Sequence, residues 1–236
     1  GKPSHWTSLL QESYMQGKYE MALEALKGYR QVHGDQDFQQ LMEAGCYYWL
    51  GEFDKGLKVI DQYLANSPED KNGLATKGEL LLGKGKPEEA LRVFQRLNLL
   101  FPEEEPYERM VQHCEYAIEH GPFTKEDAEA FLGEYWVATL SNFHINVGYE
   151  LGHLSFQAKD QQKFLMYRYD DLSFGMPYPA KIDFRRDTTT GEVLRLRLQQ
   201  ANQATFVAIH IDPDFKAAFE SFDDGDEAVA NQLREE

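Results

Sequence analysis

The sequence predicts an α+β protein of two domains, an N-terminal helical solenoid followed by an antiparallel β half-barrel or barrel with a short C-terminal helix. Two observations lead to this prediction. The first hundred residues repeat one pattern every 34 residues, which is typical of stacked helical hairpins. After Gly121-Pro122, the apolar residues change from helical spacing to the alternation that is typical of strands.

Three glycines mark the repeat, Gly17, Gly51 and Gly85. Glycine can leave the helical conformation, and the small residue five positions after each one allows two helices to approach closely. One hairpin cannot bury its own apolar face, so several must stack. We therefore expect a repeat domain at 1–121, built from units at about 3–36, 37–70 and 71–104 and a capping helix at 105–120.

These residues resemble the tetratricopeptide repeat (TPR) family, whose pattern is a glycine, an aromatic residue, an alanine, a second aromatic residue and a proline. The matching positions are Gly17, Tyr19 and Ala22, then Gly51, Phe53 and Pro68, then Gly85, Ala90, Phe94 and Pro102. Gly56, Pro87 and Gln40 depart from the pattern. The resemblance implies that a protein or peptide partner binds in a groove lined by the first helix of each hairpin.

Transferring that groove to this sequence gives a largely aromatic and apolar set, which comprises Gln11, Tyr14, Met15, Phe38, Leu41, Tyr48, Trp49, Asn72, Glu79 and Leu82, with Arg109 and His113 on the next helix. Exposed aromatic clusters often mark binding surfaces. Relatives that capture a carboxylate use Lys, Arg and Asn at such positions. Among the groove positions on the first helices of the three repeats only Asn72 is of these types, so the resemblance argues against carboxylate capture here. The alternative is that the chain's own tail or β domain covers these residues.

The second half, 122–212, is predicted to be an antiparallel β domain. Thr124 and Asp127 are typical of a helix start, and a helix is expected from 125 to about 132. Six or seven short strands follow, with a hairpin turn at Asp187 and Gly191. Their spacing predicts a sheet that curls into a half-barrel or barrel.

Two stretches of this half resemble the lipocalin-like domain found after many penicillin-binding, class C β-lactamase-type serine hydrolases. They are the segment 131–135 and an F-x-R-D-x-x-x-G-E-V hairpin at Phe184, Arg186, Asp187, Gly191 and Val193. The resemblance would cover about 124–211 and implies a bacterial protein of the periplasm or cell surface, with the cytoplasm as the alternative. The S-x-x-K nucleophile motif of those hydrolases is absent.

The last segment, 213–236, is predicted to be an acidic tail with a short helix. Phe215, Phe219 and Phe222 have the spacing of one helical face, and an acidic turn follows them at 223–227. Such a face is expected to pack against the repeat domain or the open end of the sheet.

The composition narrows the classes of partner. A net charge of −16 and an isoelectric point near 4.8 argue against nucleic acid and against an anionic membrane surface. No apolar run is long enough for a transmembrane helix, so we expect no membrane insertion. The two cysteines, Cys46 and Cys114, lie two repeats apart, too far for a disulfide, and are predicted to be small buried hydrophobic residues.

The sequence contains no G-x-S-x-G, phosphate-loop or H-E-x-x-H motif. His144 and His153 with Asp170 or Asp171 could form a metal site, but strand histidines are more often solvated, and the acid pair is more typical of a turn. The acidic run at 223–226 resembles half of a calcium loop without its distal glutamate. We therefore expect no catalytic, metal or cofactor residues.

The function that these observations favour is a non-catalytic interaction or scaffold protein, with a peptide or protein in the TPR groove and the β domain as a docking or ligand module. Two alternatives stay open. The chain could be an enzyme accessory subunit, or it could bind a small apolar ligand in the β domain. The sequence leaves the oligomeric state open.

Overall fold

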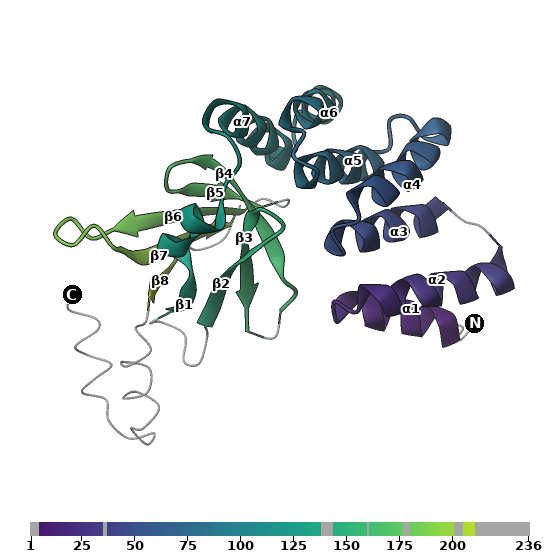
Figure 1. The fold of residues 1–236 in the computed structure, drawn as a ribbon, viewed down its shortest axis with the longest axis horizontal. Coiled ribbons are helices and arrows are strands. Elements are labelled where there is room, and N and C mark those ends of the chain that lie inside the picture. The colour runs from purple at the N-terminus through teal and green to yellow at the C-terminus, as the bar shows by residue number, and fades with distance from the viewer. Residues whose placement is uncertain are drawn as a thin grey trace, which may run out of the picture. The chain divides into compact units, whose positions relative to one another are not determined.

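The structure is a computed structural model. It describes residues 5–34, 37–137, 144–159, 161–176, 180–200 and 205–210. The chain divides into two compact units, Gly1–Pro122 and Phe123–Glu236 (Figure 1). The first unit is helical and the second is an antiparallel β-barrel, so the predicted two-domain α+β fold is confirmed. The short helix expected at 213–236 lies outside the described residues.

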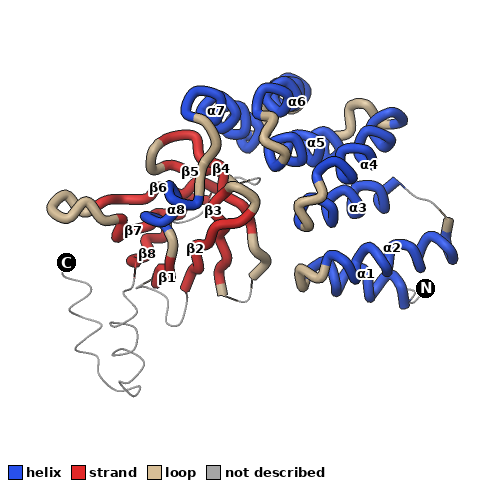
Figure 2. The backbone as a smooth tube through the Cα atoms, viewed as in Figure 1, coloured by secondary structure: helices blue, strands red, loops and turns tan. Residues whose placement is uncertain are grey.

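The helical unit is a succession of antiparallel hairpins, in which each helix packs on the next along the chain (Figure 2). The helices are α1 (His5–Met15), α2 (Tyr19–His33), α3 (Asp37–Trp49), α4 (Phe53–Asn66), α5 (Lys71–Gly83), α6 (Pro87–Leu100) and α7 (Glu105–His120). Within each predicted repeat the first helix is odd-numbered and the second even-numbered, and α7 occupies the place of the predicted capping helix.

The three repeat glycines have the same backbone conformation. Gly17, Gly51 and Gly85 adopt φ values of +70°, +71° and +74°, in the left-handed region that favours glycine. At each turn, the N–H of the residue after the glycine donates to a carbonyl five residues back, at 2.8 to 2.9 Å. This bond closes a Schellman turn, which satisfies a carbonyl at the end of the first helix. The predicted turns between paired helices are confirmed.

Gly85→Val is expected to lower the free energy of unfolding of the helical unit by about 1 kcal/mol or more, because a β-branched residue is strained at positive φ. Space around the glycine is open, with nothing within 4 Å of a Cβ placed there, so the effect isolates the backbone. Urea unfolding followed by circular dichroism at 222 nm measures it. Gly85→Asn is the control, since asparagine tolerates this conformation, and equal stability of the two variants would contradict the prediction.

Small residues allow neighbouring helices to approach closely, both within a hairpin and between successive hairpins. Ala22, Gly56 and Ala90, the small positions of the repeat, are buried. A Cβ at Gly56 would lie 2.5 Å from a methyl group of Leu80, and one at Gly78 would lie 2.4 Å from the ring of Phe94. Hence the ring and methyl groups fill the space that the glycines leave.

Both cysteines are free thiols in buried positions, as the sequence predicted. Burial raises the pKa of the Cys46 thiol and of the Cys114 thiol to about 12. Both groups therefore stay protonated at neutral pH and behave as apolar side chains.

The second unit begins with a helical turn. Thr124 and Asp127 form a capping box at the start of α8 (Lys125–Ala128), as predicted. The regular helix is shorter than the expected 125–132, because a 3₁₀ turn, η1 (Glu129–Phe131), replaces its second half. Gly133, with φ of +137°, then starts the first strand.

The barrel is closed. Its strands are β1 (Gly133–Trp136), β2 (His144–Glu150), β3 (His153–Ala158), β4 (Phe164–Asp170), β5 (Ser173–Gly175), β6 (Ala180–Arg186), β7 (Val193–Gln200) and β8 (Phe206–His210). Every strand pairs antiparallel with its neighbours along the chain, and β8 pairs with β1. The sheet is therefore closed between β1 and β8, as in a barrel and not a half-barrel. The structure describes eight strands, one or two more than the six or seven predicted.

The predicted hairpin turn between β6 and β7 is confirmed. A carboxylate oxygen of Asp187 accepts hydrogen bonds from the N–H groups of Thr189, at 2.7 Å, and Thr190, at 2.9 Å. These bonds lower the pKa of Asp187. Gly191 completes the turn with φ of +77°.

The described strands and η1 contribute a cluster of buried apolar side chains to the core of the barrel. Its centre is an aromatic cluster, in which Phe184 contacts Phe131 at 4.9 Å, Phe174 at 5.5 Å and Tyr135 at 5.8 Å between ring centroids. The hydroxyl of Tyr135 donates to the carbonyl of Phe131 at 2.9 Å. Phe131 belongs to η1, so the helical turn contributes a ring to the core of the barrel.

Candidate functional site

The predicted groove residues come from all four odd-numbered helices of the first unit, and their exposure varies. Met15, with 57% of its surface exposed, and Phe38, with 39%, are open to solvent, as is Asn72. Tyr48 and His113 are buried, with 5% and 4% exposed. Gln11 is also exposed and Leu82 is buried, and the remaining members are half-buried: Tyr14, Leu41, Trp49, Glu79 and Arg109.

Three aromatic members of the predicted groove, Tyr14, Tyr48 and Trp49, form part of a continuous chain of ring contacts. Tyr14 meets Tyr19 edge-on at 5.6 Å, and Tyr19 stacks on Trp49 at 5.7 Å with 3° between the ring planes. Trp49 contacts Tyr48, which contacts Phe53. We call these five rings the aromatic chain. It connects helices α1 to α4 through their side chains.

Two members of the aromatic chain were not among the predicted groove residues. Tyr19 and Phe53 lie at the start of α2 and α4, two positions after a repeat glycine. The sequence signal for them was the recurring aromatic residue at this position. That residue is part of the repeat pattern, and its ring also contacts a ring of the first helix, Tyr14 for Tyr19 and Tyr48 for Phe53.

Tyr14 occupies a space that a glycine provides. Its hydroxyl oxygen lies 2.8 Å from the place where Gly45 would carry a Cβ, so a larger residue at 45 would displace it. Burial raises the pKa of Tyr14, with smaller contributions from Cys46, Tyr19 and Glu79. The phenol therefore stays protonated and can donate a hydrogen bond at any physiological pH.

Glu79 introduces a carboxyl group beside these rings. Burial raises its pKa to about 7. Its charge also contributes to raising the pKa of Tyr14 on α1 and of Tyr107 on α7, although burial is the larger cause for both phenols. The carboxyl of α5 is therefore electrostatically coupled to groups on two other helices and changes charge near neutral pH.

The other predicted polar residues lie on α7. Arg109 and His113 are four residues apart, so they share one face of the helix. The side-chain atoms Nε and Nη2 of Arg109 are buried. At the other end of the unit, Phe38 packs edge-on against Tyr29 of α2 at 5.6 Å.

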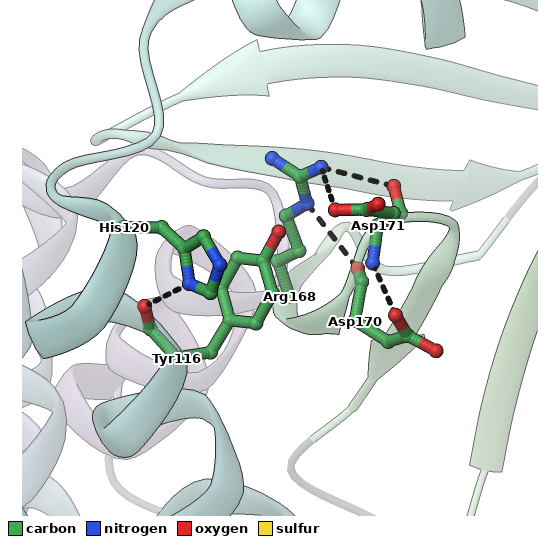
Figure 3. A network of polar contacts seen from close by, with 5 residues as sticks. All are labelled: Tyr116, His120, Arg168, Asp170 and Asp171. Atoms are coloured by element: carbon green, nitrogen blue, oxygen red, sulfur yellow. Dashed lines mark hydrogen bonds and ion pairs between the residues drawn. The ribbon is translucent and has the colours of Figure 1, made fainter.

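In the barrel, Asp170 and Asp171 form the turn between β4 and β5, as the sequence predicted (Figure 3). Asp170 accepts a hydrogen bond from the N–H of Asp171 at 2.7 Å. The guanidinium of Arg168 donates to both backbone carbonyls, at 3.2 and 3.1 Å. These bonds give both acids a structural role.

The structure does not bring the strand histidines together. His144 begins β2 and His153 begins β3, and the register pairs His153 with Glu150 at the opposite end of β2. His144 instead stacks on Trp136 at 5.9 Å. Across the described ranges, no group of three or more His, Cys, Asp or Glu side chains is placed to hold a metal ion. In the same ranges, no helix has the length and apolar character needed to cross a membrane.

No protein-family model matches the chain, and no curated protein matches it. Several solved structures, among them the following two, are similar to part of the chain. The first TPR of Spaghetti (RPAP3), bound to the HSP90 peptide SRMEEVD, is 17% identical, with a TM-score of 0.44 over 48% of this chain and 90% of that one. A mutant O-GlcNAc transferase from Thermobaculum terrenum is 14% identical, with a TM-score of 0.42 over 46% of this chain and 21% of that one.

Proposed function

We propose that the helical unit is a protein-interaction module that holds a peptide or protein segment against its odd-numbered helices. The observation that carries this proposal is the aromatic chain, which starts at Tyr14, the residue before the exposed Met15, and includes the half-buried rings of Tyr14, Tyr19 and Trp49. Tyrosine and tryptophan contribute much of the binding energy in protein interfaces, because they present large, rigid surfaces. The buried Tyr48, which contacts the rings of Trp49 and Phe53, is assigned to support the half-buried rings of the aromatic chain.

The charges near the aromatic chain indicate what such a segment does not carry. Glu79 is coupled to Tyr14, and above its pKa of about 7 it would repel a second carboxylate. A segment that binds beside Tyr14 is therefore proposed to be apolar or aromatic there, not a chain terminus. This agrees with the expectation that carboxylate capture does not occur at these positions.

For the barrel we propose a docking role and not a catalytic one. Its described interior is occupied by buried side chains from its strands and from η1, which disfavours an apolar ligand inside it. The likeness to lipocalin-like domains and the role as an enzyme accessory subunit stay predictions.

Met15→Asp is expected to remove at least about nine-tenths of the captured partner, since it places a charge at an exposed position one residue from Tyr14. The measurement is affinity capture with the full chain from cells of the native organism, quantified by mass spectrometry. Met15 is exposed, so circular dichroism should show an unchanged fold.

Met21→Asp is the matched control. It makes the same chemical change at an exposed methionine of α2, with 45% of the residue exposed. A partner that is lost equally from both variants, or retained by both, would count against binding at the odd-numbered helices.

A further inference from the structure

A concave site lies between α4, α5 and α6, and none of its lining residues belongs to the aromatic chain. Its volume is about 380 Å³, within the range of ligand pockets. The floor is apolar and largely buried, made by Leu64, Leu74, Leu81 and Val93. We call this site the α5 pocket.

Two glycines of α5 shape the α5 pocket by bringing the neighbouring helices close. A Cβ at Gly73 would lie 2.8 Å from side-chain atoms of Tyr63 and Leu64 on α4. A Cβ at Gly78 would lie 2.4 Å from the Phe94 ring on α6. The two close contacts bring α4 against α5 near its start, at Gly73, and α6 against α5 near its middle, at Gly78. The depression between the three helices is therefore a property of the packed unit.

The polar lining of the α5 pocket is mostly cationic. Lys77, Arg92 and Arg96 line it, against a single carboxylate, Glu89. That carboxylate is already engaged, because Lys86 donates to it at 2.6 Å. The hydrogen bond from Lys86 lowers the pKa of Glu89. The cations thus outnumber the acids among the lining residues of a strongly acidic chain.

The acids that approach these cations are at exposed positions. Asp61 accepts a hydrogen bond from Lys77 at 2.7 Å, and Glu69 lies 3.9 Å from Arg96. Exposed ion pairs add little to stability, so an incoming carboxylate can replace either acid at small cost. Residues 51–100, which contain the α5 pocket, carry eight Lys and Arg against eight Asp and Glu, so the net charge of −16 arises elsewhere in the chain.

We propose that the α5 pocket binds an acidic peptide segment, in which an apolar side chain enters the floor and neighbouring carboxylates meet Lys77, Arg92 and Arg96. The apolar floor supplies the burial that a small inorganic anion cannot use, and the cationic rim favours acids over bases. The site is separate from the aromatic chain and has the opposite charge preference.

The test uses the full chain and a fluorescein-labelled octapeptide of alternating leucine and glutamate, with binding measured by fluorescence anisotropy. We expect Arg92→Glu and Arg96→Glu each to weaken binding at least about tenfold. Arg185→Glu, the same change at an exposed arginine of β6, is the matched control and should leave the affinity unchanged. Circular dichroism verifies that all three variants fold.

Two further peptides separate the contributions of charge and apolar contact. An octapeptide of alternating serine and glutamate should bind at least about tenfold more weakly, and one of leucine and lysine should not bind. The proposal is overturned if the serine peptide binds equally well, or if inorganic phosphate at equal concentration displaces the leucine and glutamate peptide. It is also overturned if Arg185→Glu loses as much affinity as the pocket variants, or if the leucine and glutamate peptide does not bind at about 1 mM.

Discussion

Phe184→Ala is expected to destabilise the barrel by about 3 to 5 kcal/mol, the range for removing a buried phenylalanine from a packed core. The ring is buried and contacts Phe131, Phe174 and Tyr135 at centroid distances from 4.9 to 5.8 Å. Strands and η1 enclose it on several sides, so the surroundings cannot collapse fully into the space it leaves. The loss of stability therefore includes both the loss of buried apolar surface and the cost of the cavity that remains.

Hydrogen exchange resolved by mass spectrometry suits this measurement, because it reports the barrel strands separately from the helices. The control is Val207→Ala on β8, a residue with 49% of its surface exposed, which should change stability by no more than about 0.5 kcal/mol. If strands β6 and β7 keep their protection in Phe184→Ala, Phe184 is not the centre of the core.

The helical half could be predicted closely because its signal is local. Gly17, Gly51 and Gly85 are chemically distinct at a fixed interval, and each needs only its neighbouring residues to form a Schellman turn. Closure of the barrel could not be predicted in the same way. Alternating residues identify strands but not their partners, and the pairing of β8 with β1 joins residues that are far apart in the sequence.

The candidate site, too, could be predicted only in part. The register placed Tyr14, Met15 and Trp49 on the first helices of their hairpins, and they lie there. Exposure was less predictable, because it depends on what neighbouring helices contribute. Tyr48 is buried between the rings of Trp49 and Phe53, and the sequence pattern contains no information about that contact.

Glu79 makes the stability of the helical unit depend on pH. Burial raises the pKa of this carboxyl to about 7, from an ordinary value of 4.5. The folded state therefore binds the proton more tightly than the unfolded state. The stability that the protonated Glu79 contributes to the folded state is fully present below about pH 4.5. It is lost as the pH rises through 7, because the folded protein must then hold a partly buried carboxylate.

Glu79→Gln is expected to remove this dependence, since glutamine has a similar shape and stays neutral. The full shift of the pKa corresponds to about 3 kcal/mol. The side chain is only half-buried, so we expect the stability of the variant relative to the parent to increase by about 1 to 2 kcal/mol between pH 5 and pH 8.5. Urea unfolding at both pH values, followed at 222 nm, measures this change.

Glu108→Gln, at an exposed glutamate of α7, is the control for the loss of one negative charge from the same unit. Removing a charge from an acidic chain reduces general repulsion at high pH, and both variants share that effect. Only the gain in stability of Glu79→Gln beyond that of Glu108→Gln reports the burial of the Glu79 carboxyl. If the two variants gain equally between pH 5 and pH 8.5, the Glu79 carboxyl is hydrated in the folded protein and does not change charge near neutral pH.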